Sequence, residues 1–511
     1  MKKFLLVLLL IILPSIASSQ IILTAKVGFE GKCKPNQWTP IMVEADNPDG
    51  DIKGRFTIST PYNSYGSDIT EWKDLPYVFD VHIPKETKSR YWLYLPFEQY
   101  PQELKLNLVV NHKTIAATNL FVNTSEGQNA IVLGAVKDKS ISNAEIPVEP
   151  QESPCRKIIL VSQAILPDEW IGYDGVFRVL IDNTSLQQLT PKQNKSLDQW
   201  ACLKGKIINI DGMTQEQVVS LLKKEATQSL DFNARALNIG DLLSNIPQMR
   251  VPSPGVIFLL LFIYILIMGP GNYLILKWKK RYELSWISIP AIVILFGLAF
   301  FIFGVTIKGT KTILNEISVL QVPTGKNWGV LESYLGLFSP RRASYTFSFR
   351  PQTFISLPGD SYMDLSRLPY KILQSENESR LTNFIIKKWC MRTITTHSIL
   401  CLDGHINIWL TDNKLTVKNS SNYKLLDCGI VMNGVYRSLG EIKAGSRQEN
   451  VRIDRLKIKK DFQAKKIIRY EESENLFLGW FEKPIARLEI PGTKYERKGR
   501  ALLITPVVMG Q

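Results

Sequence analysis

Two long uncharged stretches constrain this chain more than any other feature of its sequence. Residues 251–276 and 284–307 contain no Asp, Glu, Lys or Arg, and each is longer than the roughly 20 residues that a helix needs to cross a membrane. The loop between them, residues 277–283, carries four basic residues and one acidic residue. The sequence therefore predicts two transmembrane helices, 251–276 and 284–307. By the positive-inside rule, the loop 277–283 is expected to be cytoplasmic.

The first 19 residues have the pattern of a secretory signal peptide. Lys2 and Lys3 precede an apolar run over residues 4–13, and small residues follow it. Ten apolar residues are too few to cross the hydrocarbon core, which argues against a retained anchor. We expect a signal peptide over residues 1–19, cleaved after Ala17 or Ser19. The segments on either side of the hairpin would then both be extracytoplasmic.

The positive charge of the chain lies mostly in its C-terminal part. The net charge is +15, and residues 308–511 hold 32 basic against 19 acidic residues. Because this segment is expected to face away from the cytoplasm, nucleic acid is excluded as a partner. The membrane itself, and anionic lipid headgroups or surface polymers, are the counterparts such a charge can meet. A solvated basic surface with no dedicated ligand is the alternative.

Residues 20–126 alternate between apolar and polar side chains in seven short runs separated by turn-forming residues. This pattern predicts an immunoglobulin-like β-sandwich. The runs are Ile21–Val27, Thr39–Ala45, Gly54–Ser59, Tyr77–Ile83, Tyr91–Leu95, Leu104–Val110 and Ile115–Val122.

One segment of this domain, Asp46–Asp51, is rich in carboxylates and has two interpretations. Carboxylate oxygens suit calcium, but the glutamate that closes an EF-hand loop is missing downstream. Asn, Pro, Asp and Gly are also the residues that a tight turn between strands requires. We therefore expect a turn here.

Residues 127–250 change to continuous apolar runs, which are typical of strands buried on both faces. Between the last two runs, Thr190, Pro191 and Gln193 form the start signal of a helix with a capping box. A second helix is expected over Gln215–Lys224. Because strands and helices alternate, the sequence predicts an α/β domain with a largely parallel sheet. The runs are Ala130–Val136, Lys157–Val161, Val176–Ile181 and Lys206–Ile210.

Residues 308–511 return to short strands and predict a second β-rich domain. Asn433 and Gly434 between apolar runs are a strong hairpin signal. Glu474–Phe481 is interpreted as one short amphipathic helix. The expected strands are Glu316–Val322, Tyr345–Arg350, Thr393–Leu400, His405–Leu410, Leu415–Asn419, Leu425–Met432 and Leu502–Thr505.

Several short motifs carry a resemblance to a known family. They are Gly269–Tyr273, Arg281–Trp286 with Pro290, Leu335–Arg342, Leu166–Asp174 and the stretch Leu189–Asp211. Together they resemble a family of bacterial membrane proteins whose extracytoplasmic domain looks like a class I glutamine amidotransferase and has no assigned reaction. The resemblance implies an amidotransferase-like fold over residues 127–250, and association with MoxR-type ATPases or von Willebrand A-like proteins.

An active amidotransferase needs a Cys at a glycine-flanked strand-to-helix turn and a His close to it in the fold. The α/β segment has two cysteines, Cys155 and Cys202, and neither is flanked in that way. No His lies between His112 and His397. We therefore predict a fold without this chemistry, with no catalytic residue and no cofactor.

The carboxylates of the α/β segment give the alternative to this prediction. An envelope hydrolase or amidotransferase-like enzyme could use Asp168, Asp174 and Asp182, provided that these side chains meet around one pocket.

Cys390, His397, Cys401 and His405 have the residue types of a tetrahedral zinc site. On a strand, however, His397 and Cys401 share one face while Cys390 lies on the other. A Cys390–Cys401 disulfide and two unpaired buried thiols are the favoured alternatives, because an exported site does not keep its thiols reduced by default.

The expected function is that of a non-enzymatic, membrane-anchored extracytoplasmic recognition or scaffold protein of the bacterial envelope. Its partners would be other envelope proteins. A hydrolase or amidotransferase-like enzyme is one alternative, and an accessory subunit of an export complex is another.

Overall fold

The computed structural model describes residues 21–34, 37–63, 70–97, 103–124, 131–136, 145–146, 156–203, 207–214, 216–218, 220, 239, 242–243, 253–357, 370–375, 377–458, 467 and 475–509. The signal peptide predicted over residues 1–19 lies outside them. The chain is β-rich and divides into two compact units. The first consists of residues 1–232 with 360–377, and the second of residues 233–359 with 378–511.

Unit 1 begins with two antiparallel sheets whose strands include all seven predicted runs. Their apolar faces supply a shared core, in which the rings of Phe56 and Tyr91 meet edge to face with centroids 5.7 Å apart. The first sheet has the order β1 (Ile22–Val27), β3 (Gln37–Asn47), β6 (Thr87–Phe97). The second contains β5 (Thr70–Ile83), β4 (Ile52–Asn63), β7 (Glu103–Val110) and β8 (Lys113–Phe121), and β2 (Lys32–Cys33) pairs with β9 (Asn123–Thr124).

A strand from far along the chain extends the second sheet. Strand β19 (Lys371–Gln374) pairs in parallel with β5, placing Ile372 opposite Tyr77. Both of these side chains are buried, so the pairing belongs to the core of unit 1. The continuous domain expected over residues 308–511 is therefore interrupted, because residues 360–377 belong to unit 1.

The remainder of unit 1 contains a parallel sheet in the order β12 (Arg156–Leu160), β10 (Ile131–Ala135), β13 (Val176–Ile181), β14 (Ile207–Asn209), with β11 (Glu145–Ile146) antiparallel at its edge. Two short 3-10 turns, η2 (Gln163–Ile165) and η3 (Trp170–Tyr173), follow β12. Two helices, α2 (Asn183–Gln187) and α3 (Pro191–Leu203), follow β13.

The predicted capping box at the start of α3 is confirmed. The Thr190 amide donates to the Gln193 side chain at 3.1 Å, and the Gln193 amide donates to the Thr190 hydroxyl at 3.3 Å. Gln193 is buried, and its side-chain nitrogen also donates to the Leu166 carbonyl at 2.8 Å. This residue therefore joins the helix start to the η2–η3 segment. Most of the second predicted helix, Gln215–Lys224, lies outside the described residues.

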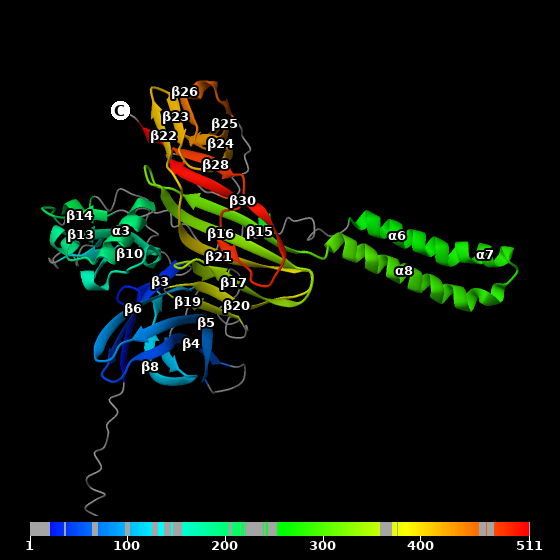
Figure 1. The fold of residues 1–511 in the computed structure, drawn as a ribbon, viewed down its shortest axis with the longest axis horizontal. Coiled ribbons are helices and arrows are strands. Elements are labelled where there is room, and N and C mark those ends of the chain that lie inside the picture. Colours follow the sequence, from blue (N-terminus) through cyan, green and yellow to red (C-terminus); the bar gives the residue numbers. More distant parts are fainter. Residues whose placement is uncertain are drawn as a thin grey trace, which may run out of the picture. The chain divides into compact units, whose positions relative to one another are not determined.

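Unit 2 is built on a nine-stranded sheet, which Figure 1 shows in green to red. Its strands pair antiparallel except β15 and β30, which are parallel neighbours over ten residue pairs. The order is β18 (Phe354–Ser356), β21 (Cys390–Cys401), β16 (Trp328–Ser339), β15 (Thr312–Gln321), β30 (Tyr495–Pro506), β28 (Leu476–Phe481), β24 (Leu425–Met432), β25 (Val435–Ile442), β27 (Lys457–Ile458).

One expected element of this unit is wrong. Leu476–Phe481 is strand β28 rather than part of a short helix. It lies between β24 and β30, and five of its six residues are buried. A strand covered on both faces has no polar alternation, so its apolar run could not be distinguished from a short helix. The predicted hairpin is confirmed: Asn433 and Gly434 have φ of 49° and 73° between β24 and β25.

Two smaller groups of strands complete unit 2. One has the order β26 (Arg447–Arg452), β23 (Lys414–Asn419), β22 (Ile406–Thr411), β31 (Val508–Met509). In the other, β17 (Ala343–Phe349) pairs with β20 (Ser379–Ile386) and with β29 (Leu488–Glu489).

The core of unit 2 includes residues that were expected in the α/β domain. Ile239 and Leu243 are fully buried in one cluster with Val319, Tyr334 and Leu502 of the nine-stranded sheet. The Asn315 side chain fixes this segment by donating to the Leu243 carbonyl at 2.8 Å. The boundary predicted at residue 250 therefore shifts to about residue 233, because these apolar side chains are buried against the second unit.

Candidate functional site

The most distinctive feature of unit 2 is the apolar helical hairpin. Its first arm joins α6 (Pro254–Leu266), a π-helical turn over Ile267–Gly271 and α7 (Asn272–Trp278). Its second arm joins a 3-10 turn over Tyr282–Leu284 to α8 (Ser285–Lys308). Figure 1 shows the two arms running side by side in opposite directions. The spans Pro254–Trp278 and Tyr282–Gly304 have mean hydropathies of 2.2 and 2.5, so both are long and apolar enough to cross a membrane.

The surface of the hairpin is apolar over its length. Phe258, Ile294 and Leu295 are 73%, 71% and 66% exposed, and neither span is buried within the described structure. A few aromatic contacts join the arms, among them Tyr264 and Phe296 with ring centroids 5.1 Å apart. An apolar surface of this extent is unfavourable in water and favourable in lipid, so the hairpin is a candidate membrane anchor.

Pro270 explains the irregular turn in the first arm. Proline has no amide hydrogen and disrupts the regular hydrogen bonding of a helix, and a π-helical turn around it keeps the chain helical. The cap at the end of this turn is Asn272, which is buried although it is polar.

The connection between the arms has a defined backbone geometry. The Arg281 amide donates to the Leu276 carbonyl and the Lys280 amide to the Lys277 carbonyl, both at 3.1 Å. These two bonds form a Schellman motif, which requires its C′ residue to be left-handed. That residue is Lys280, with φ of 50°. Glycine is usual at this position, so the chain places a lysine where the backbone favours a residue without a side chain.

Four basic side chains surround this connection and are exposed. They are Lys277, Lys279, Lys280 and Arg281, and in the described part of the chain none of them forms an ion pair. Lys277 lies 6.0 Å from the centroid of the Tyr273 ring. We call residues 277–286 the basic turn.

The structure separates the four residues proposed for zinc. Cys390 and Cys401 are the first and last residues of strand β21, whereas His405 follows the strand. His397 is buried and lies opposite Glu332 in the pairing of β21 with β16, while both cysteines are exposed. Among the described residues no group of three or more His, Cys, Asp or Glu could hold a metal ion. Cys390, His397, Cys401 and His405 therefore do not come together as one tetrahedral site in the described structure.

The same strand rules out the alternative disulfide. Eleven residue steps at roughly 3.3 Å each place Cys390 and Cys401 about 36 Å apart along β21. A disulfide requires Cα atoms within about 7 Å. Cys33, Cys390, Cys401 and Cys428 are free thiols, and Cys390 and Cys401 are exposed rather than buried as expected. Cys155, considered as a nucleophile, lies outside the described residues, and Cys202 lies within α3.

Asp168, Asp174 and Asp182 each bind a different element. Oδ1 of Asp168 accepts from the Tyr94 hydroxyl at 2.5 Å, and Oδ2 of Asp174 accepts from the Trp38 amide at 3.3 Å. Asp182 caps helix α2 by accepting from the Ser185 amide at 2.6 Å. The first two bonds tie the η3 segment to strands β6 and β3, and the third is a helix cap. These three bonds join the carboxylates to three different elements, β6, β3 and α2.

Asp168 has an unusual electrostatic environment. Burial raises the pKa of its carboxyl above the usual value, opposed by the Tyr94 hydrogen bond and by the nearby Lys192. Burial, followed by the charge of Asp168, raises the pKa of the Tyr94 hydroxyl well above 10. The Glu169 amide donates to the same hydroxyl oxygen at 3.1 Å. This arrangement orders the junction between the sheets and the η3 segment.

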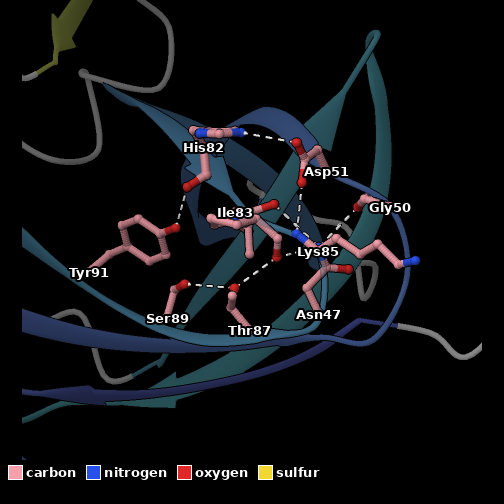
Figure 2. Close-up of polar contacts among 10 residues, drawn as sticks. Asn47, Gly50, Asp51, His82, Ile83, Lys85, Thr87, Ser89 and Tyr91 are labelled. Carbon is pink, nitrogen blue, oxygen red and sulfur yellow. Dashed lines mark hydrogen bonds and ion pairs between the residues drawn. The ribbon is translucent and has the colours of Figure 1, made fainter.

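The Asp46–Asp51 segment is a turn, as Figure 2 shows. The buried Asn47 side chain donates to the carbonyls of Gly50 and Pro84 at 3.0 Å each, and of Ile83 at 3.3 Å. Asp51 accepts from the Lys85 amide at 2.8 Å. Both side chains therefore connect the β3–β4 turn to the β5–β6 turn rather than gathering around an ion.

Sequence reasoning missed two buried carboxylates on the nine-stranded sheet. Glu316 is fully buried and accepts from the Ser318 hydroxyl and from the Ile485 and Ala486 amides at 2.7, 3.1 and 2.9 Å. Arg497 pairs with its other oxygen at 2.5 Å. Glu332, the second, accepts from the Tyr334 hydroxyl. Each is a single carboxylate among the apolar residues of a strand. Because a polar side chain in such a sequence usually faces water, its burial was not predicted.

Two parts of the chain match known family profiles. Residues 20–123, which hold strands β1 to β9, match a domain of unknown function (DUF8726). Residues 403–510, which hold strands β22 to β31, match another domain of unknown function (DUF8725). Neither profile extends over the hairpin or the parallel sheet. A search of curated proteins finds no match to this chain.

Proposed function

We propose that this protein is a non-enzymatic, membrane-anchored extracytoplasmic recognition or scaffold protein of the bacterial envelope. The observation that carries the proposal is the hairpin, whose two apolar arms are exposed within an otherwise β-rich chain. The hairpin would fix the protein in the membrane, with its basic loop 277–283 in the cytoplasm and the other described elements outside.

The hydrogen bonds and ion pairs of the buried carboxylates support a binding role rather than a catalytic one. The carboxylates of the α/β segment form structural bonds, and the buried Glu316 is saturated by donors from its own unit. The order β12-β10-β13-β14 is that of a doubly wound sheet, which supports an amidotransferase-like fold for this segment. By family resemblance, MoxR-type ATPases or von Willebrand A-like proteins are the proposed partners.

Thiol labelling in intact bacterial cells tests the topology. Cys390 and Cys401 are both exposed, so a membrane-impermeant maleimide added outside the cells is expected to label them. A cysteine introduced as Lys279→Cys is expected to react only after the cells are opened. Labelling of Lys279→Cys from outside, with Cys390 and Cys401 protected, would mean the opposite orientation.

Photo-crosslinking tests the recognition role. Phe121 and Ile458 are large apolar side chains, 72% and 60% exposed, one in each unit. A photo-crosslinking amino acid at either position is expected to form a covalent adduct with a discrete envelope protein. The buried Phe56 is the matched control position. Absence of any adduct at both exposed positions contradicts a scaffold role.

A further inference from the structure

The basic turn carries more positive charge than its interactions within the described structure neutralise. Lys277, Lys279, Lys280 and Arg281 are exposed and form no ion pair in the described part of the chain. Glu283, the one acidic residue of the loop, forms no ion pair with them in the described part of the chain. Two cations can be assigned to the helix end, where they complement the negative pole of α7. The remaining charge has no ion-pair partner among the residues that the structure describes.

The backbone adds an independent observation. At the C′ position of the Schellman motif, a residue other than glycine is strained, because its Cβ atom crowds the following carbonyl oxygen. Lys280 occupies this position with φ of 50°. Neither of the two bonds of the motif requires the Lys280 side chain. The Lys280 side chain is exposed, so its ammonium group is available for a contact outside the chain.

Aromatic side chains place the basic turn at a lipid–water boundary. Trp278 is 85% exposed and Trp286 is 75% exposed, one on each side of the connection. Tyr282, between them, is also half exposed. Tryptophan and tyrosine favour the headgroup level of a bilayer, because one end of each ring is apolar and the other is polar. With these rings at the headgroups, the four cations lie in the plane of the lipid phosphates.

We propose that the basic turn is a binding site for anionic phospholipid headgroups. Its lysine and arginine side chains pair with lipid phosphates, while Trp278 and Trp286 hold the turn at the depth of those phosphates. The hairpin would then select its lipid neighbours rather than only span the bilayer. This inference rests on the proposed membrane anchor, and the experiment separates the two.

The experiment uses the full-length protein in lipid nanodiscs that contain phosphatidylcholine with an increasing share of pyrene-labelled phosphatidylglycerol. Energy transfer from tryptophan to pyrene measures the local enrichment of the anionic lipid. Each basic side chain near an anionic surface contributes about a fivefold preference. The triple variant Lys279→Gln, Lys280→Gln, Arg281→Gln is therefore expected to lower the enrichment by at least about tenfold.

A matched variant removes the same charge elsewhere on unit 2. Lys311→Gln, Lys414→Gln and Lys443→Gln change three exposed lysines and should leave the enrichment unchanged. An equal loss in this control, or no loss in the first triple variant, overturns the proposal. Competition by free glycerophosphoglycerol at the same concentration as the lipid also overturns it, because the site would then take soluble phosphates.

Extraction with alkaline carbonate measures membrane anchoring separately from lipid preference. Both triple variants should stay in the membrane pellet, because the apolar arms are unchanged. Release of the unmodified protein into the soluble fraction would reject the anchor itself. Retention without any preference for phosphatidylglycerol would reject only the lipid site.

Discussion

The hydroxyl of Tyr94 donates to Oδ1 of Asp168 at 2.5 Å, joining strand β6 to the segment that precedes η3. Because burial raises the pKa of Asp168, ionisation of this carboxyl destabilises the folded protein. The stabilising effect of the protonated form is fully present below the usual carboxyl pKa and is lost as pH rises through the raised value.

Asp168→Asn should therefore be at least as stable as the unmodified protein at neutral pH, and its advantage should disappear in acid. Thermal unfolding of the full chain in detergent across this pH range measures the difference. Tyr94→Phe, in contrast, is expected to cost about 1–3 kcal/mol, because it leaves the buried carboxyl without its donor. Tyr91→Phe, which removes a hydroxyl bonded to the exposed His82 carbonyl, is the control. A larger loss for Asp168→Asn at neutral pH than in acid would contradict this account.

Glu316 and Arg497 form an ion pair in unit 2 at 2.5 Å. Glu316 is fully buried, so Glu316→Gln should destabilise the protein by about 3–5 kcal/mol, since it leaves Arg497 without its charge partner. Urea unfolding followed by tryptophan fluorescence measures this. Glu449→Gln breaks the exposed Arg447 pair and is expected to change stability by less than about 1 kcal/mol. Similar losses in both variants would show that burial does not set the strength of the pair.

Gly499 is required where β30 lies against β15. Its φ is 131°, and a Cβ atom there would lie 2.0 Å from the Glu316 carbonyl oxygen. Gly499→Ala should cost about 3–5 kcal/mol, combining backbone strain with a clash against main chain that cannot move aside. Gly492 also has a positive φ, of 71°, but has open space around it, so Gly492→Ala should cost about 1–2 kcal/mol. Equal melting temperatures for the two variants would rule out the clash.

The anchor predicts that charge on the exposed face of α8 is costly. Ile294 is 71% exposed near the middle of the second span, so Ile294→Arg should disfavour insertion by about 2.5–3.5 kcal/mol. The fraction of protein that resists carbonate extraction should fall accordingly. Ile22→Arg, at a position 62% exposed in unit 1, should have no effect on this fraction. Unchanged extraction of Ile294→Arg would mean that α8 does not lie in lipid.

Buried and exposed cysteines should differ in their reactivity toward maleimide. Burial raises the pKa of Cys33 to about 11 and that of Cys428 to about 12, so little thiolate forms at neutral pH and both should resist maleimide. The exposed Cys390 and Cys401 should be modified in the folded protein without a reducing agent. Mass spectrometry of peptides counts the modified sites. Protection of Cys390 and Cys401 that reductant removes would indicate a disulfide and contradict the geometry of β21.

Periodicity predicted the seven main strands of the two N-terminal sheets, and the capping residues predicted the start of α3. The seven alternating runs all form strands, and the Thr190–Gln193 capping box is present, because both signals depend on residues close together in the chain. The apolar arms of the hairpin were predicted from length and charge for the same reason.

Long-range pairing was not predictable from the same signals. Nothing in Lys371–Gln374 indicates that it pairs with β5, since the sequence of a four-residue strand does not specify which strand it pairs with. Strand β16 and strand β28 are buried on both faces and so lack alternation, which left the first unassigned and the second interpreted as a helix. Glu316 could not be identified because its donors, Ile485, Ala486 and Arg497, come from distant segments.

The pairing of β19 with β5 also sets the order of events during synthesis. Because ribosomes deliver the chain from its N-terminus, both arms of the hairpin emerge before Lys371–Gln374 can reach unit 1. During that interval β5 has an open edge, and an unpaired edge is a template for pairing with another chain. Completion of the first unit thus depends on synthesis of the chain beyond the hairpin, and protein stalled before that point would be the form most exposed to aggregation and proteolysis.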